Sequence, residues 1–320
     1  MKKIGVLTSG GDTPGMNAAI RSVVRIGLNY NYTMLGVYHG YEGLMAGNVK
    51  TMTSSDVHGI TQRGGTILRT ARSEIFRTPE GYNKALDIIH AYEMDALIVI
   101  GGDGSFHGAQ MLSDLGINVI GIPGTIDNDM GYTDFTIGFD TAVNNVMGEM
   151  EKILDTMRSH DRVGVIEVMG RNCGDIALWS ALTGPADLVL TPEMPVDWAE
   201  ATRILVQRKL KGHLVSLVVI AEGAGSASDF AKYVQEHSDV EIRPVVLGYI
   251  QRGGTPSAAD RMLATRLGAR AVDLIAEGKQ NRAVGIRNNQ IIDVDINEAI
   301  TIHEARDLSL FDLHRKVNPR

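Results

Sequence analysis

Three loops in the sequence combine glycines with carboxylates, the residue types that proteins use to bind phosphorylated ligands and metal ions. Glycine lets backbone N–H groups approach an anion closely, especially where a helix begins. A carboxylate can hold Mg²⁺ or accept a proton from a hydroxyl group. Each loop follows a short apolar run, and the loops are Thr8-Ser9-Gly10-Gly11-Asp12-Thr13-Pro14-Gly15-Met16-Asn17, Gly101-Gly102-Asp103-Gly104-Ser105 and Pro123-Gly124-Thr125-Ile126-Asp127-Asn128-Asp129. Their composition predicts a site for a phosphorylated substrate.

The first loop has the glycine spacing of a nucleotide-binding P-loop but lacks its other residues. Gly10 and Gly15 are separated by four residues, yet Met16-Asn17 stands where a P-loop requires Lys followed by Ser or Thr. Pro14 suits the first turn of a helix, with Thr13 as its cap. The chain is therefore not a P-loop protein, and this corner is either an anion site or a structural turn.

The second and third loops carry the candidate metal ligand and the candidate general base. Asp103 is placed to hold Mg²⁺, which prefers few carboxylates together with substrate oxygens. Its loop does not fit the dinucleotide pattern G-x-G-x-x-G, and a purely structural turn would also favour glycine. Asp127 and Asp129 make a candidate general base and its partner, with an Asx-turn as the structural alternative.

Arginines accompany these loops. A guanidinium group can grip phosphate with two parallel hydrogen bonds and stabilise the charge that spreads over a transferring phosphoryl group. A single surface arginine is more often simply solvated, but five lie near glycines or predicted strand ends: Arg72, Arg162, Arg171, Arg243 and Arg252. The set favours a phosphoryl-transfer site.

The spacing of apolar residues predicts the elements that position these loops. Continuous apolar runs indicate strands buried on both faces, and they are Ile4–Leu7, Ala96–Ile100, Val119–Ile122, Val163–Val168, Leu188–Leu190, Leu214–Ile220 and Val245–Ile250. Segments of helical period lie between them: Met16–Leu28, Thr141–Met157, Trp198–Lys209 and Asp260–Ala276. This alternation predicts a doubly wound α/β fold, whose ligands bind where strands end and helices begin.

Length, repeats and charge narrow the function further. At 320 residues the chain suits two domains, and the repeated Gln-Arg-Gly-Gly-Thr, at 62–66 and 251–255, suggests two related lobes. A net charge of −7 argues against a nucleic-acid partner. A single cysteine, Cys173, suits a reducing compartment, and no apolar stretch approaches the roughly 20 residues of a membrane span. We expect a cytoplasmic protein with no membrane partner.

With these motifs in view, the chain resembles the bacterial ATP-dependent 6-phosphofructokinases over nearly its whole length. The resemblance rests on the three loops together with Val168-Met169-Gly170-Arg171-Asn172-Cys173-Gly174-Asp175 and Gly248-Tyr249-Ile250-Gln251-Arg252-Gly253-Gly254. It implies two doubly wound, Rossmann-like lobes with mainly parallel sheets and the active site between them. The larger, ATP-binding lobe would take residues 1–138 and 251–301, and the smaller, sugar-phosphate-binding lobe 139–250 and 302–320.

The resemblance implies Mg²⁺-dependent phosphoryl transfer from ATP to the 1-hydroxyl of fructose 6-phosphate, a step of glycolysis. Asp127 would be the base and Asp103 the metal ligand, and the catalytic set would be Gly11, Arg72, Thr125, Asp127, Asp129 and Arg171. The ATP would be held by Gly11, Arg72, Ser73, Gly102, Asp103, Gly104 and Ser105. The sugar phosphate would be held by Thr125, Ile126, Asp127, Arg162, Met169, Gly170, Arg171, Glu222, Arg243, Tyr249, Ile250, Gln251 and Arg252.

Assembly follows from the same resemblance. Arg162 and Arg243 would reach the 6-phosphate from a neighbouring subunit, so a homotetramer is expected. An effector site for ADP or phosphoenolpyruvate would use Arg21, Arg25, Leu154, Asp187, Lys211 and His213. At three of its positions, where relatives tend to be basic, this chain has Ser54, Leu154 and His213, so we expect weak responses to both effectors.

Two further positions bear on the substrates. Pyrophosphate-using relatives tend to have Asp and Lys where this chain has Gly104 and Gly124, so ATP is the expected donor. Tyr249 stands where relatives usually have His, so we expect somewhat weaker binding of fructose 6-phosphate. Two other readings stay open: another kinase with a Gly-Gly-Asp-Gly loop, such as an NAD or lipid kinase, and a related sugar-phosphate kinase or non-catalytic regulatory homologue.

Overall fold

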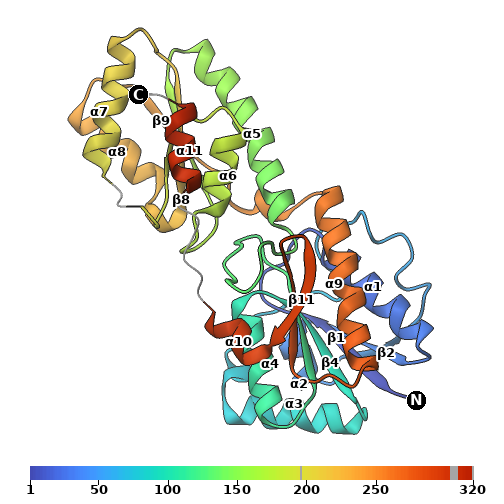
Figure 1. Ribbon diagram of the computed structural model, residues 1–320. Helices are drawn as coiled ribbons and strands as arrows, with labels where there is room; N and C mark the ends of the chain where they lie inside the picture. The colour runs from blue at the N-terminus through green and yellow to red at the C-terminus, as the bar shows by residue number, and fades with distance from the viewer. Residues whose placement is uncertain (195–196, 303–308, 319–320) are drawn as a thin grey trace. The chain divides into compact units, whose positions relative to one another are not determined.

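The structure is a computed structural model that describes residues 1–194, 197–302 and 309–318 (Figure 1). The chain divides into two compact units. The larger comprises Met1–Ile126, Met130–Asp140 and Arg252–Glu304, and the smaller comprises Asp127–Asp129, Thr141–Gln251 and Ala305–Arg320. Each unit is built around its own sheet.

The larger unit contains a seven-stranded sheet in the order β11-β10-β5-β4-β1-β2-β3. Its strands are β1 (Lys3–Thr8), β2 (Thr33–Val37), β3 (Val49–Met52), β4 (Ala96–Gly101), β5 (Val119–Pro123), β10 (Arg282–Arg287) and β11 (Gln290–Asp295). The neighbours β2, β1, β4, β5 and β10 are parallel, and only the outermost strands β3 and β11 pair antiparallel.

Helices cover both faces of this sheet because successive residues of each central strand point to opposite sides. Ile98 and Ile100 of β4 belong to the core beneath α1 (Met16–Asn29) and α9 (Ala258–Ala276), whereas Leu97 and Val99 belong to the core on the other face. That second face is covered by α2 (Gly40–Met45), α3 (Pro79–Ala91), α4 (Asp103–Asp114) and α10 (Ile296–Thr301).

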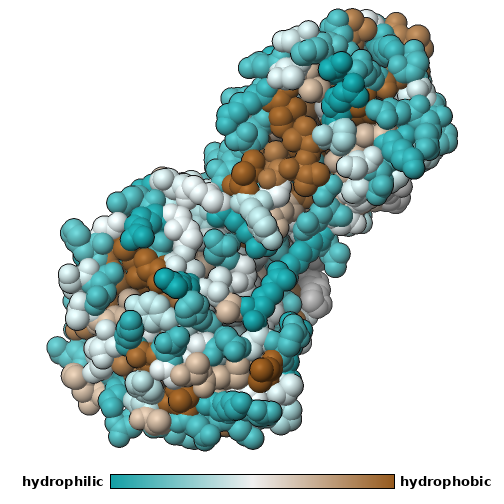
Figure 2. All heavy atoms as spheres, turned by 180° about the vertical axis from the view of Figure 1, so that it is seen from behind, coloured by the Kyte–Doolittle hydropathy of each residue, from teal (hydrophilic) through white to brown (hydrophobic). Residues whose placement is uncertain are grey.

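The smaller unit contains a four-stranded, fully parallel sheet in the order β7-β8-β6-β9. Its strands are β6 (Val163–Val168), β7 (Leu188–Leu190), β8 (Ser216–Ala221) and β9 (Ile242–Val246), and its helices are α5 (Phe139–Ser159), α6 (Asp175–Thr183), α7 (Trp198–Leu210), α8 (Ala227–His237) and α11 (Ser309–Val317). On the face turned away from the viewer in Figure 1, this unit carries a patch of apolar side chains (Figure 2).

The predicted α/β class with mainly parallel sheets is confirmed, but one predicted strand is wrong. Residues 245–250 do not form a strand: β9 ends at Val246, and Gly248–Arg252 forms the 3₁₀ turn η3. Gly248 has a φ of 55°, a left-handed conformation that ends the extended chain. The strands β2, β3, β10 and β11 were not predicted. None of the helices among the described residues is long and apolar enough to cross a bilayer.

Candidate active site

The first two predicted loops and the start of the third lie side by side in the larger unit because they follow three neighbouring parallel strands, whereas Asp127–Asp129 of the third loop belong to the smaller unit. Leu7 of β1 is in register with Val99 of β4, and Gly101 of β4 is in register with Pro123 of β5. The Ser9 N–H donates to the Ile100 carbonyl at 3.0 Å, and the Gly124 N–H donates to the Gly101 carbonyl at 2.9 Å. Glycines far apart in the sequence therefore meet, together with Asp103, at the carboxyl edge of one sheet.

The first and second loops pack too closely for a side chain at Gly101. A Cβ at Gly101 would lie 2.6 Å from the Ser9 carbonyl oxygen and 2.4 Å from the Ser105 hydroxyl. Ser105 is itself held by Tyr41, whose hydroxyl donates to the Ser105 carbonyl at 2.6 Å. Burial raises the pKa of Tyr41 well above its usual range, so the phenol stays a neutral donor.

The second loop presents Asp103 at the first turn of α4. Its side chain is 47 % exposed, and one carboxylate oxygen lies 3.4 Å from Nδ1 of His107, one turn further along the helix. A Cβ at the next residue, Gly104, would meet no atom within 4 Å. The fold itself therefore leaves open space at Gly104, beside an accessible carboxylate.

Arg72 and Ser73 belong to a segment that is fastened to the first loop. The Thr70 hydroxyl donates to the Gly10 carbonyl at 2.7 Å, two residues before Arg72. The Arg72 side chain is exposed, and the Ser73 hydroxyl accepts a hydrogen bond from the Phe76 N–H at 3.2 Å. Arg252 also belongs to the larger unit, where its guanidinium group lies 3.0–3.4 Å from the position that a Cβ would take at Gly11.

Asp127 and Arg171 meet in the smaller unit. Asp127 is only 3 % exposed, and one of its carboxylate oxygens lies 3.3 Å from Nε of Arg171, whose side chain is 55 % exposed. The next residue, Asn128, has a φ of 53° and donates from its amide to the Asp175 carboxylate at 2.8 Å. This bond ties the loop that bears Asp127 to the first residue of α6.

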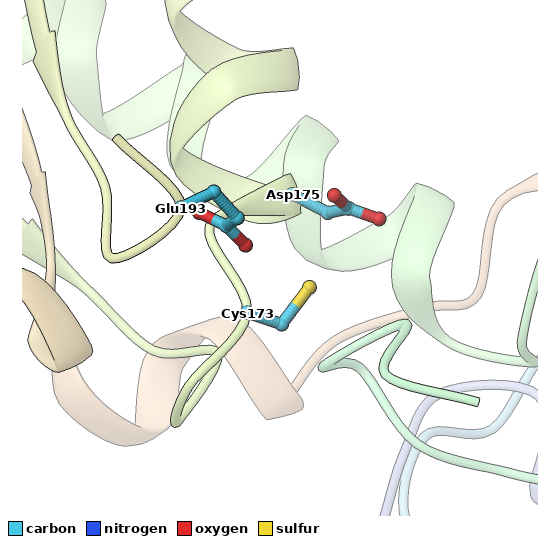
Figure 3. Close-up of side chains that lie close together, drawn as sticks. All are labelled: Cys173, Asp175 and Glu193. Atoms are coloured by element: carbon cyan, nitrogen blue, oxygen red, sulfur yellow. The ribbon is translucent and has the colours of Figure 1, made fainter. Parts of the chain in front are cut away.

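Cys173, Asp175 and Glu193 lie close together, with the Cys173 sulfur and one carboxylate oxygen of each acidic residue all within 4.8 Å of one another (Figure 3). Cys173 is a free, buried thiol. Both carboxylates hold the loop: Asp175 accepts from Asn128, and Glu193 accepts from the Gly174 N–H at 2.6 Å. The cluster therefore fixes the backbone on which Asp127 and Arg171 stand.

A pocket opens at the carboxyl ends of β6, β8 and β9 in the smaller unit. Glu222 accepts hydrogen bonds from the N–H groups of Gly170 and Arg171 at 3.2 and 2.8 Å. Tyr249 is 80 % exposed at its mouth. The lining residues are Glu167, Val168, Met169, Glu222, Val246, Gly248, Tyr249 and Gln251.

Arg162 and Arg243 lie toward the other end of these strands. Val163 of β6 is in register with Ile242 of β9, and both arginines contact the same Glu241 carboxylate oxygen, at 2.8 and 2.7 Å. Arg162 precedes β6 and Met169 follows it, and a strand of six residues spans about 20 Å. Arg162 is therefore remote from the pocket of its own chain.

The predicted effector residues fall in both units. Arg21 and Arg25 lie on α1 in the larger unit, and the buried Leu154 lies on α5 in the smaller. Lys211 and His213 follow α7. Asp187 already has two partners: Arg208 at 2.5 Å through one oxygen, and the Leu217 N–H at 2.9 Å through the other.

Sequence reasoning missed several residues that shape the site. Glu167 lines the pocket. Asn128 and Asp175 anchor the loop that bears Asp127, and Arg208 forms an ion pair with Asp187. Asn128 lies within the third glycine loop, and Asp175 is the last residue of the motif that begins at Val168. Membership of these motifs was the signal that could have marked both residues. Nothing in the spacing of Arg208 marked it as a partner of Asp187.

The comparisons with known proteins agree with this geometry. The phosphofructokinase family model matches residues 3–275. The chain belongs to the phosphofructokinase family. It is 53 % identical over 313 residues to an ATP-dependent 6-phosphofructokinase of Clostridium botulinum (strain Loch Maree / Type A3), covering 98 % of each chain. It is 53 % identical over 318 residues to the Clostridium tetani protein of the same name, covering 99 % of this chain and 100 % of that one.

Solved structures show the same family fold. The chain superimposes on a phosphofructokinase from Saccharomyces cerevisiae with a TM-score of 0.88 and 35 % identity, covering 99 % of this chain. It spans about half of that longer chain, 47 %. A pyrophosphate-dependent phosphofructokinase from Marinobacter aquaeolei has a TM-score of 0.86 at 22 % identity, which establishes the shared fold alone.

Proposed function

We propose that this protein transfers a phosphoryl group from ATP to the 1-hydroxyl of fructose 6-phosphate, giving fructose 1,6-bisphosphate and ADP. The observation that carries the proposal is the buried Asp127 carboxylate beside the exposed Arg171 guanidinium group. It stands in a chain that is 53 % identical over nearly its full length to proteins named ATP-dependent 6-phosphofructokinase.

Asp127 is the proposed general base. A carboxylate accepts the proton of the sugar hydroxyl as the oxygen attacks the γ-phosphorus, and such a base typically contributes about 10²–10⁴-fold. Arg171, 3.3 Å from that carboxylate, can stabilise the negative charge that spreads over the transferring phosphoryl group. Gly11, Arg72, Thr125 and Asp129 complete the proposed catalytic set, with Arg72 near the transferring phosphates.

The larger unit is the proposed donor-binding part, which would hold ATP and Mg²⁺. Gly10 and Gly11 precede the helix α1, where backbone N–H groups favour an anion. Asp103 fits Mg²⁺ because it is a single accessible carboxylate in a glycine loop, and this ion prefers one or two carboxylates plus phosphate oxygens. When bound, the ion would neutralise phosphate charge. Open space at Gly104 favours ATP over pyrophosphate as the donor.

The smaller unit is the proposed acceptor-binding part. Its pocket would take the sugar, with Met169, Gly170 and Glu222 as contacts and Tyr249 near the phosphate. In this chain Arg162 and Arg243 are held by Glu241 away from that pocket, so we propose that they grip the 6-phosphate in a neighbouring copy. A homotetramer with shared active sites would bring these arginines of one copy to the pocket of another. Arg252, whose guanidinium group lies beside Gly11, would also grip the 6-phosphate.

The proposed effector response is weak. An ADP–Mg²⁺ complex at Asp187 would have to displace Arg208 from that carboxylate. Leu154 and His213 supply no fixed positive charge to an anionic effector, and each charge-assisted bond that is lost removes about 1.5–3 kcal/mol.

A coupled assay tests the function directly. We expect turnover with ATP, Mg²⁺ and fructose 6-phosphate, no turnover with pyrophosphate, and a loss of several orders of magnitude in Asp127→Ser. The matched control is Asp197→Ser, which changes an aspartate that caps α7 in the same unit. Absence of turnover with either donor, in a folded protein, would contradict the proposal and favour a regulatory homologue or another acceptor.

A further inference from the structure

The pocket of the smaller unit contains one buried polar side chain, that of Gln251, which the proposed chemistry does not use. In the turn η3, Tyr249 is 80 % exposed and Ile250 49 % exposed, whereas Gln251 is 0 % exposed. The turn therefore points its apolar side chains outward and its amide inward, the reverse of the usual arrangement. A buried amide costs free energy unless its hydrogen bonds are made.

Both ends of the Gln251 amide are bonded to backbone groups. Its oxygen accepts from the Met169 N–H at 3.0 Å, and its nitrogen donates to the Gly248 carbonyl at 3.1 Å. Among neutral side chains of this length, only glutamine offers an acceptor and a donor at adjacent positions. The amide therefore bridges two segments that are about 80 residues apart in the sequence.

These two segments line the pocket side by side, because they follow the neighbouring parallel strands β6 and β9. Met169 leads into Gly170 and Arg171, whose positive φ values of 135° and 53° aim their N–H groups at Glu222. Gly248, with a φ of 55°, begins the turn that carries Tyr249. The last backbone bond between these strands joins the Leu247 N–H to the Glu167 carbonyl at 3.2 Å. Beyond it, the Gln251 amide continues the link between the segment that bears Arg171 and the turn that bears Tyr249.

The turn itself does not depend on this amide. Asn145 of α5 donates from its side chain to the carbonyls of Ile250 and Gln251, at 3.3 and 3.4 Å, so the backbone of η3 has a separate attachment. Loss of the Gln251 amide should therefore let the two segments move without unfolding the unit.

We propose that Gln251 is a positioning residue that holds together the two segments lining the sugar-phosphate pocket, through Met169 and Gly248, rather than a contact of the substrate. This inference rests on the proposed function, because it assigns the pocket to fructose 6-phosphate. It differs from the substrate contact expected from the sequence, since both polar atoms of the side chain face the backbone.

The test compares Gln251→Met and Gln251→Glu with the wild-type protein. Met keeps the length and removes both bonds, and an ionised Glu keeps the acceptor but turns the donor into a second acceptor facing the Gly248 carbonyl. We expect both variants to raise the KM for fructose 6-phosphate by roughly ten- to a hundredfold, the fold-change expected from losing one or two buried hydrogen bonds. The KM for ATP should stay close to wild type, whereas the melting temperature should fall by a few degrees in both variants, which should still fold, because each leaves buried polar groups without partners.

A matched control is Gln235→Met on α8, which also removes a bond from a glutamine amide to a backbone carbonyl, that of Ile242 at 3.2 Å, outside the pocket lining. It should leave both KM values unchanged. An unchanged KM for fructose 6-phosphate in both Gln251 variants, equal changes in the two KM values, or failure of both variants to fold would each overturn the inference. Absence of wild-type turnover would instead overturn the proposed function.

Discussion

The two units hold their candidate ligand sites by different means. In the larger unit the register of β1, β4 and β5 brings three glycine loops together, and backbone hydrogen bonds join them directly. In the smaller unit the pocket depends on side chains that bond to backbone groups, chiefly those of Glu222 and Gln251. The first arrangement follows from local sequence, and the second from contacts between distant segments.

The units also differ in how complete their sites are within one chain. The donor loops have their glycines, the Asp103 carboxylate and the Arg72 segment in the same unit. The acceptor pocket has its own Glu222 and Tyr249, but Arg162 lies at the far end of β6. On the proposed function, one copy would build the donor part by itself, whereas the acceptor part would need phosphate-binding groups from another copy.

The largest expected effect is on ATP binding by the larger unit. Gly104→Asp places a carboxylate in the open space beside Asp103, where it would repel the phosphates of ATP. Two charges 4 Å apart near a protein surface interact by about 4 kcal/mol, so the KM for ATP should rise roughly a hundredfold or more. Steady-state kinetics with varied ATP measure this change.

Gly148→Asp is the matched control for that variant, because a Cβ at Gly148 on α5 also meets no atom within 4 Å and its φ is not positive. It should keep the wild-type KM for ATP. A Gly104→Asp protein that used ATP normally would contradict the assignment of this loop to the donor.

The acceptor side is tested by Arg162→Ala combined with Arg243→Ala. Each arginine lost removes charge-assisted hydrogen bonds worth about 1.5–3 kcal/mol to the sugar phosphate, so the KM for fructose 6-phosphate should rise by tenfold or more. The KM for ATP should stay near its wild-type value. Arg203→Ala, which breaks a pair with Glu200 on the exposed face of α7, serves as control and should change neither constant.

A smaller effect is expected on activation by ADP at the proposed effector site. Arg208→Ala frees the Asp187 carboxylate, so ADP with Mg²⁺ should activate this variant several-fold more than it activates the wild type. The wild type should keep a nearly hyperbolic fructose 6-phosphate curve in millimolar phosphoenolpyruvate. A strongly sigmoidal wild-type curve would show that the site has kept its response.

The smallest effect concerns pH and the smaller unit alone. Burial lowers the pKa of His314, which is 4 % exposed on α11, so the unfolded chain binds a proton more readily than the folded one. Its contribution to stability is present above the ordinary histidine pKa of about 6.5 and is lost as pH falls. Urea unfolding between pH 7.5 and 5.5 should show a weaker decline of unfolding free energy in His314→Gln than in the wild type.

The same contrast explains how much the sequence could predict. The loops around Gly10, Gly101 and Gly124 were predictable because an apolar run followed by glycine is a local pattern, and parallel strands align such loops. The strand predicted at 245–250 is wrong because the run is mostly apolar, although the chain turns at Gly248. The edge strands β3 and β11, each partly exposed, lacked a continuous apolar run.

The pocket of the smaller unit was less predictable because its key contacts join distant residues. The burial of Gln251 depends on Met169, 82 positions away, and the pairing of Arg208 with Asp187 spans 21 positions. By contrast, the remoteness of Arg162 from the pocket follows from the length of the predicted strand 163–168, which separates Arg162 from Met169.

The most direct test of the central claim, that the acceptor site is shared between copies, is a mixing experiment. Two proteins are purified separately: Asp127→Ser, and the double variant Arg162→Ala, Arg243→Ala. They are mixed in equal amounts, unfolded and refolded together. The mixture is then assayed with ATP and with a low concentration of fructose 6-phosphate. If the arginines act in a neighbouring copy, a site with Asp127 from one variant and both arginines from the other is intact, and roughly a quarter of wild-type activity should return. If the mixture is no more active than the average of the two variants refolded separately, each chain uses its own arginines and the account is contradicted.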